Sequence, residues 1–244
     1  MQSKYPSAEV IGTDVSIKSL EVCRRNADQL GIKNLKLEEQ SLNLITYEEE
    51  LDYIVCTGVI HHNADPQYTL SKLAGALKPN GVRELMVYNY YHRLFTTAAQ
   101  KAIRALSKSP LDLGLQHKMM KKLIQNFPMP CVMADFLAEF ENQKDAEMAD
   151  SLLQPVEYSY TVETLGNLLE SCGLEYMTYC VNDFGISENY ISWNIDFQDE
   201  EMRAIYSSLL DAQRWQIMLS RASAPNFSLS RSPNRFQILL PMVR

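Results

Sequence analysis

The chain has 244 residues, of which 46% are hydrophobic and 22% charged, an ordinary balance for a globular protein that can bury a core. Its net charge of −7 argues against a nucleic-acid backbone as the main partner. The sequence shows no signal peptide, no apolar run long enough to span a bilayer and no CxxC pair among its five cysteines, so we expect a cytoplasmic protein with reduced, mostly buried thiols.

The first forty residues alternate short apolar strands with one amphipathic helix. The pattern predicts a strand over Ala8–Thr13, followed by Asp14, and a second short strand at Leu35–Leu37. Between them a helix is expected to begin after the N-cap Ser16 and to end at Gly31. The predicted buried face of this helix consists of Ile17, Leu20, Cys23, Ala27 and Leu30.

The next segment predicts a second strand–helix–strand unit. Leu51–Thr57 is mostly apolar, which is typical of a strand buried on both faces in a parallel sheet. Asp65 and Pro66 mark a helix start, and Pro79–Gly81 is expected to stop that helix before a strand at Val82–Tyr88. This alternation predicts an open, mostly parallel α/β sheet with right-handed crossovers.

Helical patterns then dominate from Tyr90 to about Pro155, including a helix predicted over Ala134–Ala149. The segment is too long for a loop, so we expect a helical insertion. The sheet is predicted to resume with a helix capped by Thr161 and a strand at 174–181, followed by a helix near 200–219 and a closing strand at 236–243.

Asp14 is the first candidate for ligand chemistry. A carboxylate just past a strand of a nucleotide-binding sheet can accept hydrogen bonds from both ribose hydroxyls of a nucleoside. A capping or turn Asp would look the same, and an NAD-dependent dehydrogenase would carry an acid at this place. Asp14 alone therefore does not distinguish these alternatives.

The run VIHHNADP, which follows Thr57, is more informative. Ligands bind beyond the carboxyl ends of strands in open α/β sheets, and Gly58 would let the backbone approach such a ligand closely. Adjacent histidines are poor metal ligands without a third ligand at matching spacing, so we expect no metal site. His61 or His62 could act as a general base, or one of them could hydrogen-bond the strand-to-helix turn.

Together with Asp14 upstream and Lys78-Pro79-Asn80-Gly81 downstream, this run resembles the class I S-adenosylmethionine (SAM)-dependent methyltransferases. The resemblance implies a Rossmann-like, doubly wound, mostly parallel sheet with a helical insertion, and SAM as the cofactor. It divides the chain into a partial SAM-binding core (1–90), a helical lid (91–155) and a C-terminal part that completes the sheet (156–244).

The resemblance also implies a set of cofactor contacts. Asp14 corresponds to the ribose ligand and Val15 lies beside the adenine. Ser41 stands where the family usually has an acidic residue, and its hydroxyl can still accept a hydrogen bond. The remaining implied contacts are Leu42, against the adenine ring, and Thr57, Gly58 and Val59, which flank the methionine end of SAM.

The polar and aromatic residues at the start of the insertion are the substrate candidates. Tyr88, Tyr91 and His92 follow a strand's carboxyl end at the mouth of the predicted lid, where either a substrate pocket or tyrosine packing between lid and sheet would place them. The catalytic candidates are His61, His62 and Tyr88.

The glycine-rich strand–turn–helix that opens the family's fold is expected before Val10, where only nine residues stand. In the family's strand order the corresponding strand is central, between the strands that end at Asp14 and at Thr57. We therefore expect an N-terminally truncated sheet with open strand edges. Three explanations are open: the chain is the C-terminal part of a longer methyltransferase, which we favour; it is a short product that pairs with a second chain supplying the strand or rearranges its sheet; or it is an inactive remnant.

These observations predict methyl transfer from SAM to a small-molecule or lipid-like acceptor enclosed by the insertion, with weak or no activity of this chain alone. The alternative is a non-catalytic, methyltransferase-like partner or regulatory protein. A nucleotide-dependent oxidoreductase would explain Asp14 but not the run VIHHNADP. Nucleic acid is not expected as a substrate, because no Asn-Pro-Pro-Tyr motif is present to receive a flipped base.

Overall fold

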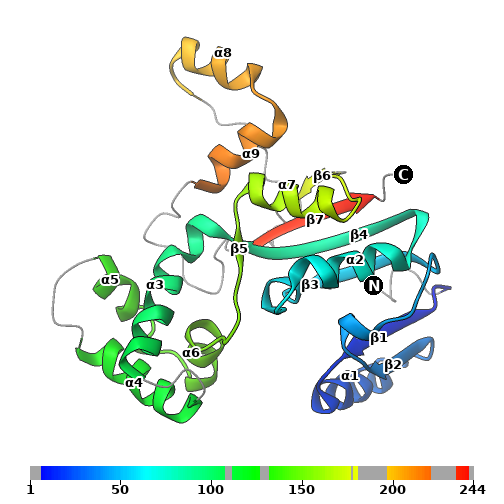
Figure 1. Ribbon diagram of the computed structural model, residues 1–244, viewed down its shortest axis with the longest axis horizontal. Helices are drawn as coiled ribbons and strands as arrows, with labels where there is room; N and C mark the ends of the chain where they lie inside the picture. Colours follow the sequence, from blue (N-terminus) through cyan, green and yellow to red (C-terminus); the bar gives the residue numbers. More distant parts are fainter. Residues whose placement is uncertain are drawn as a thin grey trace.

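The computed structural model describes residues 7–107, 112–126, 132–176, 178–180, 197–220 and 235–241. Figure 1 shows a small α/β unit formed by the N-terminal residues, a central sheet that contains one long strand, and a group of helices beside one end of that strand. The predicted mixed α/β architecture, with strands paired in parallel, is confirmed.

The N-terminal unit consists of two parallel strands and one helix. Strand β1 (Val10–Asp14) pairs with β2 (Leu35–Glu39), and helix α1 (Ile17–Gln29) connects them. The predicted N-cap is confirmed, because the Ser16 hydroxyl accepts a hydrogen bond from the Ser19 N–H at 3.3 Å. Gly31 follows the helix with a φ of 68°, a left-handed conformation that favours glycine.

The expected burial of α1 is wrong for most of its apolar stripe. Ala27 is buried, but Ile17, Cys23 and Leu30 are exposed. Two strands about 5 Å apart offer a surface no wider than the helix itself, so a stripe extending around the helix is only partly covered. Of the other cysteines, Cys56 is buried, and the side chains of Cys131 and Cys180 lie outside the described part of the chain.

The central sheet has the strand order β3-β4-β7-β6. Strand β3 (Leu51–Thr57) pairs in parallel with β4 (Leu77–Asn89), whereas β7 (Arg235–Pro241) runs antiparallel to both β4 and β6 (Thr178–Cys180). The short β5 (Ser159–Tyr160) joins the carboxyl end of β4 in parallel. Strand β7 confirms the strand predicted at 236–243, whereas β6 confirms the one predicted at 174–181 only over 178–180, since residues 175 and 176 are not in a strand. The last residues of both predicted strands lie outside the described ranges.

Helices α2 (Pro66–Ala76) and α7 (Val162–Ser171) cover one face of this sheet (Figure 1). The helix start predicted at Asp65 and Pro66 is confirmed, but α2 already ends at Ala76, and the Pro-Asn-Gly run lies within β4. The buried core between helices and sheet includes Ile54, Cys56, Ile60, Leu70, Leu73, Leu85, Val87, Leu165, Leu169 and Trp215.

The helical region has a second core of its own. It contains α3 (Tyr90–Ser107), α4 (Leu113–Asn126), α5 (Val132–Ala138) and α6 (Asp145–Leu152). The single helix predicted over 134–149 is wrong, because a turn at 139–144 places Phe140 in the core between α5 and α6. This second core consists of Ala99, Ile103, Met120, Ile124, Leu137, Phe140, Met148 and Leu152.

The helix predicted near 200–219 is also divided in two. Helix α8 (Glu200–Ser208) ends at Leu209, whose backbone is extended, and α9 (Asp211–Ser220) begins two residues later. The Leu210 N–H donates to the side-chain oxygen of Gln213 at 2.9 Å, which stabilises the new helix start. The long helix of the sequence pattern is therefore two helices with a cap between them.

Within the described ranges the two sheets are not joined, and each presents an open edge. The Gly58 N–H donates to the Met86 carbonyl at 3.2 Å, and backbone groups alternate along a parallel strand, so those of Val55 and Thr57 point away from β4. Among the described residues no strand pairs with this edge or with the outer edge of β1. The prediction that β3 is buried on both faces is wrong, since Val55 is 43% exposed.

Candidate functional site

The residues predicted to hold the adenosine part of a cofactor lie at the carboxyl ends of β1 and β2. Asp14 is exposed, and its Oδ1 accepts a hydrogen bond from the Ser16 N–H at 2.7 Å, which leaves the second carboxylate oxygen for a ligand. Val15 is 70% exposed. An exposed carboxylate next to an exposed apolar side chain suits a sugar and its attached base.

Ser41 and Leu42 are placed less favourably for a cofactor. The Ser41 hydroxyl accepts a hydrogen bond from the Asn43 N–H at 3.3 Å and caps the short helix η1 (Leu42–Leu44). The Leu42 side chain is partly buried against the core under α2. The Ser41 hydroxyl can still donate a hydrogen bond to a ligand, whereas the Leu42 side chain packs against the core.

The residues predicted at the methionine end of SAM lie at the carboxyl end of β3. Thr57 is exposed, and Val59 is 40% exposed at the start of the short helix η2 (Ile60–His62). Gly58 between them has a φ of 77°, which a residue with a Cβ adopts only with strain. The glycine thus allows the chain to turn sharply where the strand ends.

His61, His62 and Tyr88, the three catalytic candidates, form one aromatic cluster. The ring centroids of His61 and Tyr88 are 4.0 Å apart, and those of the two histidines are 4.3 Å apart. His62 meets Tyr88 edge-on at 5.5 Å. Strands β3 and β4 are parallel neighbours, so their carboxyl ends bring the histidines and the tyrosine together.

A buried ion pair supports this cluster from the helical region. The guanidinium carbon of Arg93 lies 4.2 Å from the centre of the Tyr88 ring, a cation–π contact. Arg93 donates to both carboxylate oxygens of Glu157, at 2.8 and 2.5 Å, and the two side chains are 7% and 4% exposed. Gln100 also donates to Glu157, at 3.1 Å.

Sequence reasoning missed Glu157 and Gln100. Glu157 lies 64 residues after Arg93 in the chain, and no local motif connects the two. The only local signal is that Glu157 stands between Val156 and Tyr158 just before a strand, and this pattern predicts burial of a charged residue only weakly. The contact became visible only in the folded chain.

Of the other predicted substrate residues, Tyr91 already has a structural partner. Its hydroxyl accepts a hydrogen bond from the Gln216 side chain at 2.7 Å, and Gln216 also accepts from the Val162 N–H at 3.0 Å. These bonds connect α3 to α9 and α7. His92 is partly buried on the first turn of α3. Its predicted role, like the role of Tyr91, stays a prediction.

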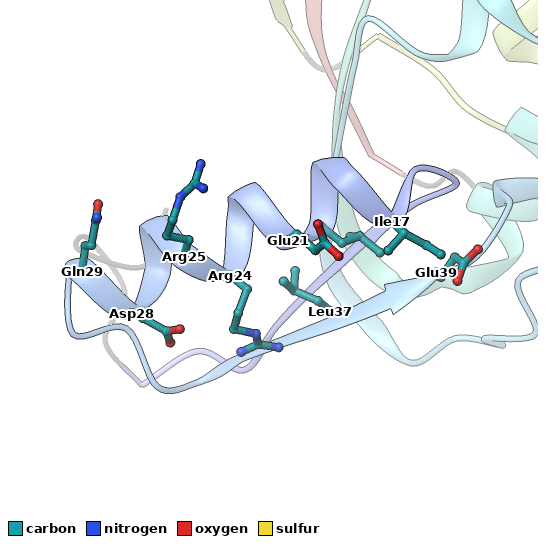
Figure 2. Close-up of a pocket in the computed structure, with 9 residues that line it drawn as sticks. Ile17, Glu21, Arg24, Arg25, Asp28, Gln29, Leu37 and Glu39 are labelled. Atoms are coloured by element: carbon teal, nitrogen blue, oxygen red, sulfur yellow. The ribbon is translucent and has the colours of Figure 1, made fainter.

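One surface hollow lies elsewhere on the described residues. Figure 2 shows a hollow of about 640 Å³ between α1 and β2, with charged side chains of both signs around it. None of the predicted site residues lines it. Its lining residues are Ile17, Leu20, Glu21, Arg24, Arg25, Asp28, Gln29, Leu37 and Glu39. The hollow extends along α1 and β2 as far as Glu39, the last residue of β2.

Two further observations concern the described residues as a whole. None of their helices is both long and apolar enough to cross a membrane. No group of three or more His, Cys, Asp or Glu side chains in these ranges is arranged to hold a metal ion.

Comparison with known families identifies the fold. Residues 1–150, more than half of the chain, match a family described as a methyltransferase domain. The chain belongs to this methyltransferase family. Membership confirms the resemblance to class I SAM-dependent methyltransferases and SAM as their cofactor.

Among curated relatives, an uncharacterized protein of Synechococcus is 27% identical over 242 residues, which cover 93% of this chain and 56% of the relative. A ubiquinone biosynthesis O-methyltransferase of Histophilus somni is 28% identical over 113 residues, covering 43% of this chain and 48% of the relative. The chain therefore spans about half the length of these relatives.

Among solved structures, PKMT2 from Rickettsia typhi is similar over 99% of this chain and 45% of its own length, with a TM-score of 0.70 and 15% identity. Its complex with AdoHcy gives a TM-score of 0.68. At this level of identity the similarity confirms the Rossmann-like fold and says nothing of the acceptor.

Proposed function

We propose that the protein to which this chain belongs transfers a methyl group from SAM to a small-molecule or lipid-like acceptor. The observation that carries the proposal is the cluster of His61, His62 and Tyr88 at the carboxyl ends of two neighbouring parallel strands. Ligands of open α/β sheets bind at this edge, and the chain belongs to a family of methyltransferases.

The residues at this edge fit the adenosine and methionine parts of SAM. Asp14 has one carboxylate oxygen without a partner among the described residues, and Val15 and Val59 expose apolar side chains. Gly58, in its left-handed conformation, lets a ligand approach the backbone. SAM supplies an activated methyl group when bound, and the protein's task is to orient an acceptor and to take up its proton.

The helix beside the cluster supports an acceptor with an apolar body. On the first turns of α3, Tyr90, Leu94 and Phe95 are each more than 40% exposed. These side chains follow directly after β4, on the chain segment that also carries Arg93. An acceptor whose apolar part contacts this surface would place its polar group near the histidines.

A second role is favoured by the open edges of β1 and β3. In this alternative the chain is one component of a larger methyltransferase or a non-catalytic partner, and a strand from a second chain or another segment lies between these two edges. Exposed backbone groups on two apolar strands favour pairing with a further strand. The chain alone would then have weak or no activity.

Calorimetric titration of the purified chain with SAM and with S-adenosylhomocysteine tests both proposals. Micromolar binding that is lost in Asp14→Ala and retained in Asp28→Ala, an exposed carboxylate on α1, would support the first. Binding that is equal in both variants would remove Asp14 from the site. A folded, monomeric chain that binds neither compound would favour the second role.

A further inference from the structure

Of three consecutive residues, Val156 and Tyr158 contact the histidine–tyrosine cluster directly, and Glu157 between them binds Arg93, which lies over the Tyr88 ring. The Val156 carbonyl lies 3.0 Å from Nδ1 of His62. The Tyr158 N–H donates to the His61 carbonyl at 2.8 Å, and its hydroxyl donates to the carbonyl of Ala64 at 3.2 Å. We call residues 156–158 the strap.

The strap determines which nitrogen of His62 carries a proton. A carbonyl oxygen can only accept, so Nδ1 of His62 must be the donor to Val156. In the neutral ring Nε2 then has the lone pair and can accept a proton. No described residue binds Nε2. His62 is partly exposed, whereas His61 is fully buried, so His62 presents the reachable basic nitrogen.

The ion pair holds the other side of the same cluster. Two parallel hydrogen bonds to Glu157 fix the plane of the Arg93 guanidinium, which lies over the Tyr88 ring. Tyr88 in turn contacts the rings of both histidines. Glu157 therefore fixes the position of the His62 ring in two ways. It anchors the neighbouring Val156 carbonyl, and it orients Arg93, which packs on Tyr88.

The strap also connects the cluster to the helical region. Arg93 and Gln100, both on α3, donate to the Ser151 carbonyl at 3.3 and 3.1 Å, and Ser151 is on α6. One buried network thus joins two helices of the insertion to the ends of β3 and β4. A shift of α3 relative to α6 would therefore change the position of the His62 ring.

We propose that Glu157 is a positioning residue: with Val156 it holds His62 in the form protonated at Nδ1, so that Nε2 of His62 accepts the proton of the acceptor. This inference rests on the proposed methyl transfer. Among the catalytic candidates it selects His62 as the base. In this view His61 is a packing residue, and Tyr88 packs between Arg93 and the two histidine rings.

Nitrogen NMR of the full chain labelled in histidine tests the proposal. The chain has four histidines, which single substitutions assign. In the neutral ring, recorded at about pH 8, we expect Nδ1 of His62 to be protonated and Nε2 to be bare. His117, on α4 and next to Asp145, is the internal reference. A His62 ring protonated at Nε2 instead would overturn the proposal.

Variants of Glu157 test the positioning role. In Glu157→Ala we expect the His62 signals to move to those of a mixed tautomer, while the His117 signals stay in place. Because loss of one buried partner can unfold the chain, the paired change Arg93→Met with Glu157→Met replaces both by apolar side chains of similar length. The same shift of His62 is expected there. Unchanged His62 signals in either folded variant contradict the proposal.

The SAM titration separates this inference from the proposed function. We expect Glu157→Ala to leave SAM affinity within twofold of the wild type, and Asp14→Ala to leave the His62 signals unchanged. Absence of SAM binding would count against the methyl-transfer proposal while the tautomer remained measurable. Once an acceptor is known, Glu157→Gln should lower kcat more than it raises KM, and an effect on KM alone would count against a role in positioning the base.

Discussion

The buried Arg83 allows a sharp test of the energetics of the central sheet. Its side chain is fully buried next to α2, and its Nη1 donates to the Leu70 carbonyl at a long 3.4 Å. Its Nε and Nη2 have no hydrogen-bond partner in the described structure. Burial lowers the pKa of Arg83 from the ordinary arginine value to about 10. At about 1.4 kcal/mol per pKa unit, the lowered pKa corresponds to a penalty of about 3 kcal/mol in the free energy of the folded state when Arg83 is charged.

The sign of the effect follows from the two pKa values. Below about pH 10, Arg83 is charged in both the folded and the unfolded chain, so the full penalty acts at pH 7. The penalty is relieved only as the pH rises above about 10 toward the higher pKa of the unfolded chain. We expect Arg83→Met, which keeps the apolar volume and removes the charge, to raise the free energy of unfolding by about 1–3 kcal/mol. The melting temperature should rise by about 2–4 °C per kcal/mol.

Arg93→Met is the matched control. Arg93 is also buried, but its removal leaves the Glu157 carboxylate without its charge partner, which costs about 3–5 kcal/mol. Urea and thermal unfolding at pH 7, followed by circular dichroism, should therefore give changes of opposite sign for the two variants. A loss of stability in Arg83→Met similar to that in Arg93→Met would refute the reasoning.

Three further predictions concern the site and the open edge. Gly58→Ala should lower the free energy of unfolding in urea by about 1–2 kcal/mol because of its positive φ, and it should weaken SAM binding. Gly173→Ala, the control, is also at positive φ but in open space, so it should lower the free energy of unfolding by a similar amount and leave SAM binding intact. The amide of Val55, on the open edge of β3, should exchange hydrogen faster than that of Cys56, which points to β4; equal protection would mean that the edge is covered. At pH 8, iodoacetamide should label Cys23 and spare Cys56, because burial hides the Cys56 thiol and raises its pKa to about 11. Peptide mass spectrometry measures both reactions, and labelling of Cys56 as early as that of Cys23 would contradict this burial.

Local signals in the sequence predicted most element starts correctly, because a cap interacts with residues only three positions away. Asp65 accepts from the Tyr68 N–H at 2.9 Å, and Thr161 accepts from the Thr164 N–H at 3.1 Å. The Leu51–Thr57 strand was located to the residue. The run VIHHNADP, with Asp14 and the Lys-Pro-Asn-Gly run, indicated the family that the comparisons confirm.

By itself, then, the sequence determined the family, the order of strands and helices, and the presence of two histidines at a strand end. Tertiary structure alone decided which faces are covered: β3 has the composition of a doubly buried strand, yet Val55 is exposed, because burial depends on which elements lie alongside. It also decided the environment of His62. The groups that orient this ring, the Val156 carbonyl and the Glu157–Arg93 pair, lie 94 and 64 residues from their partners, and contacts over such distances leave no periodic signal in a chain.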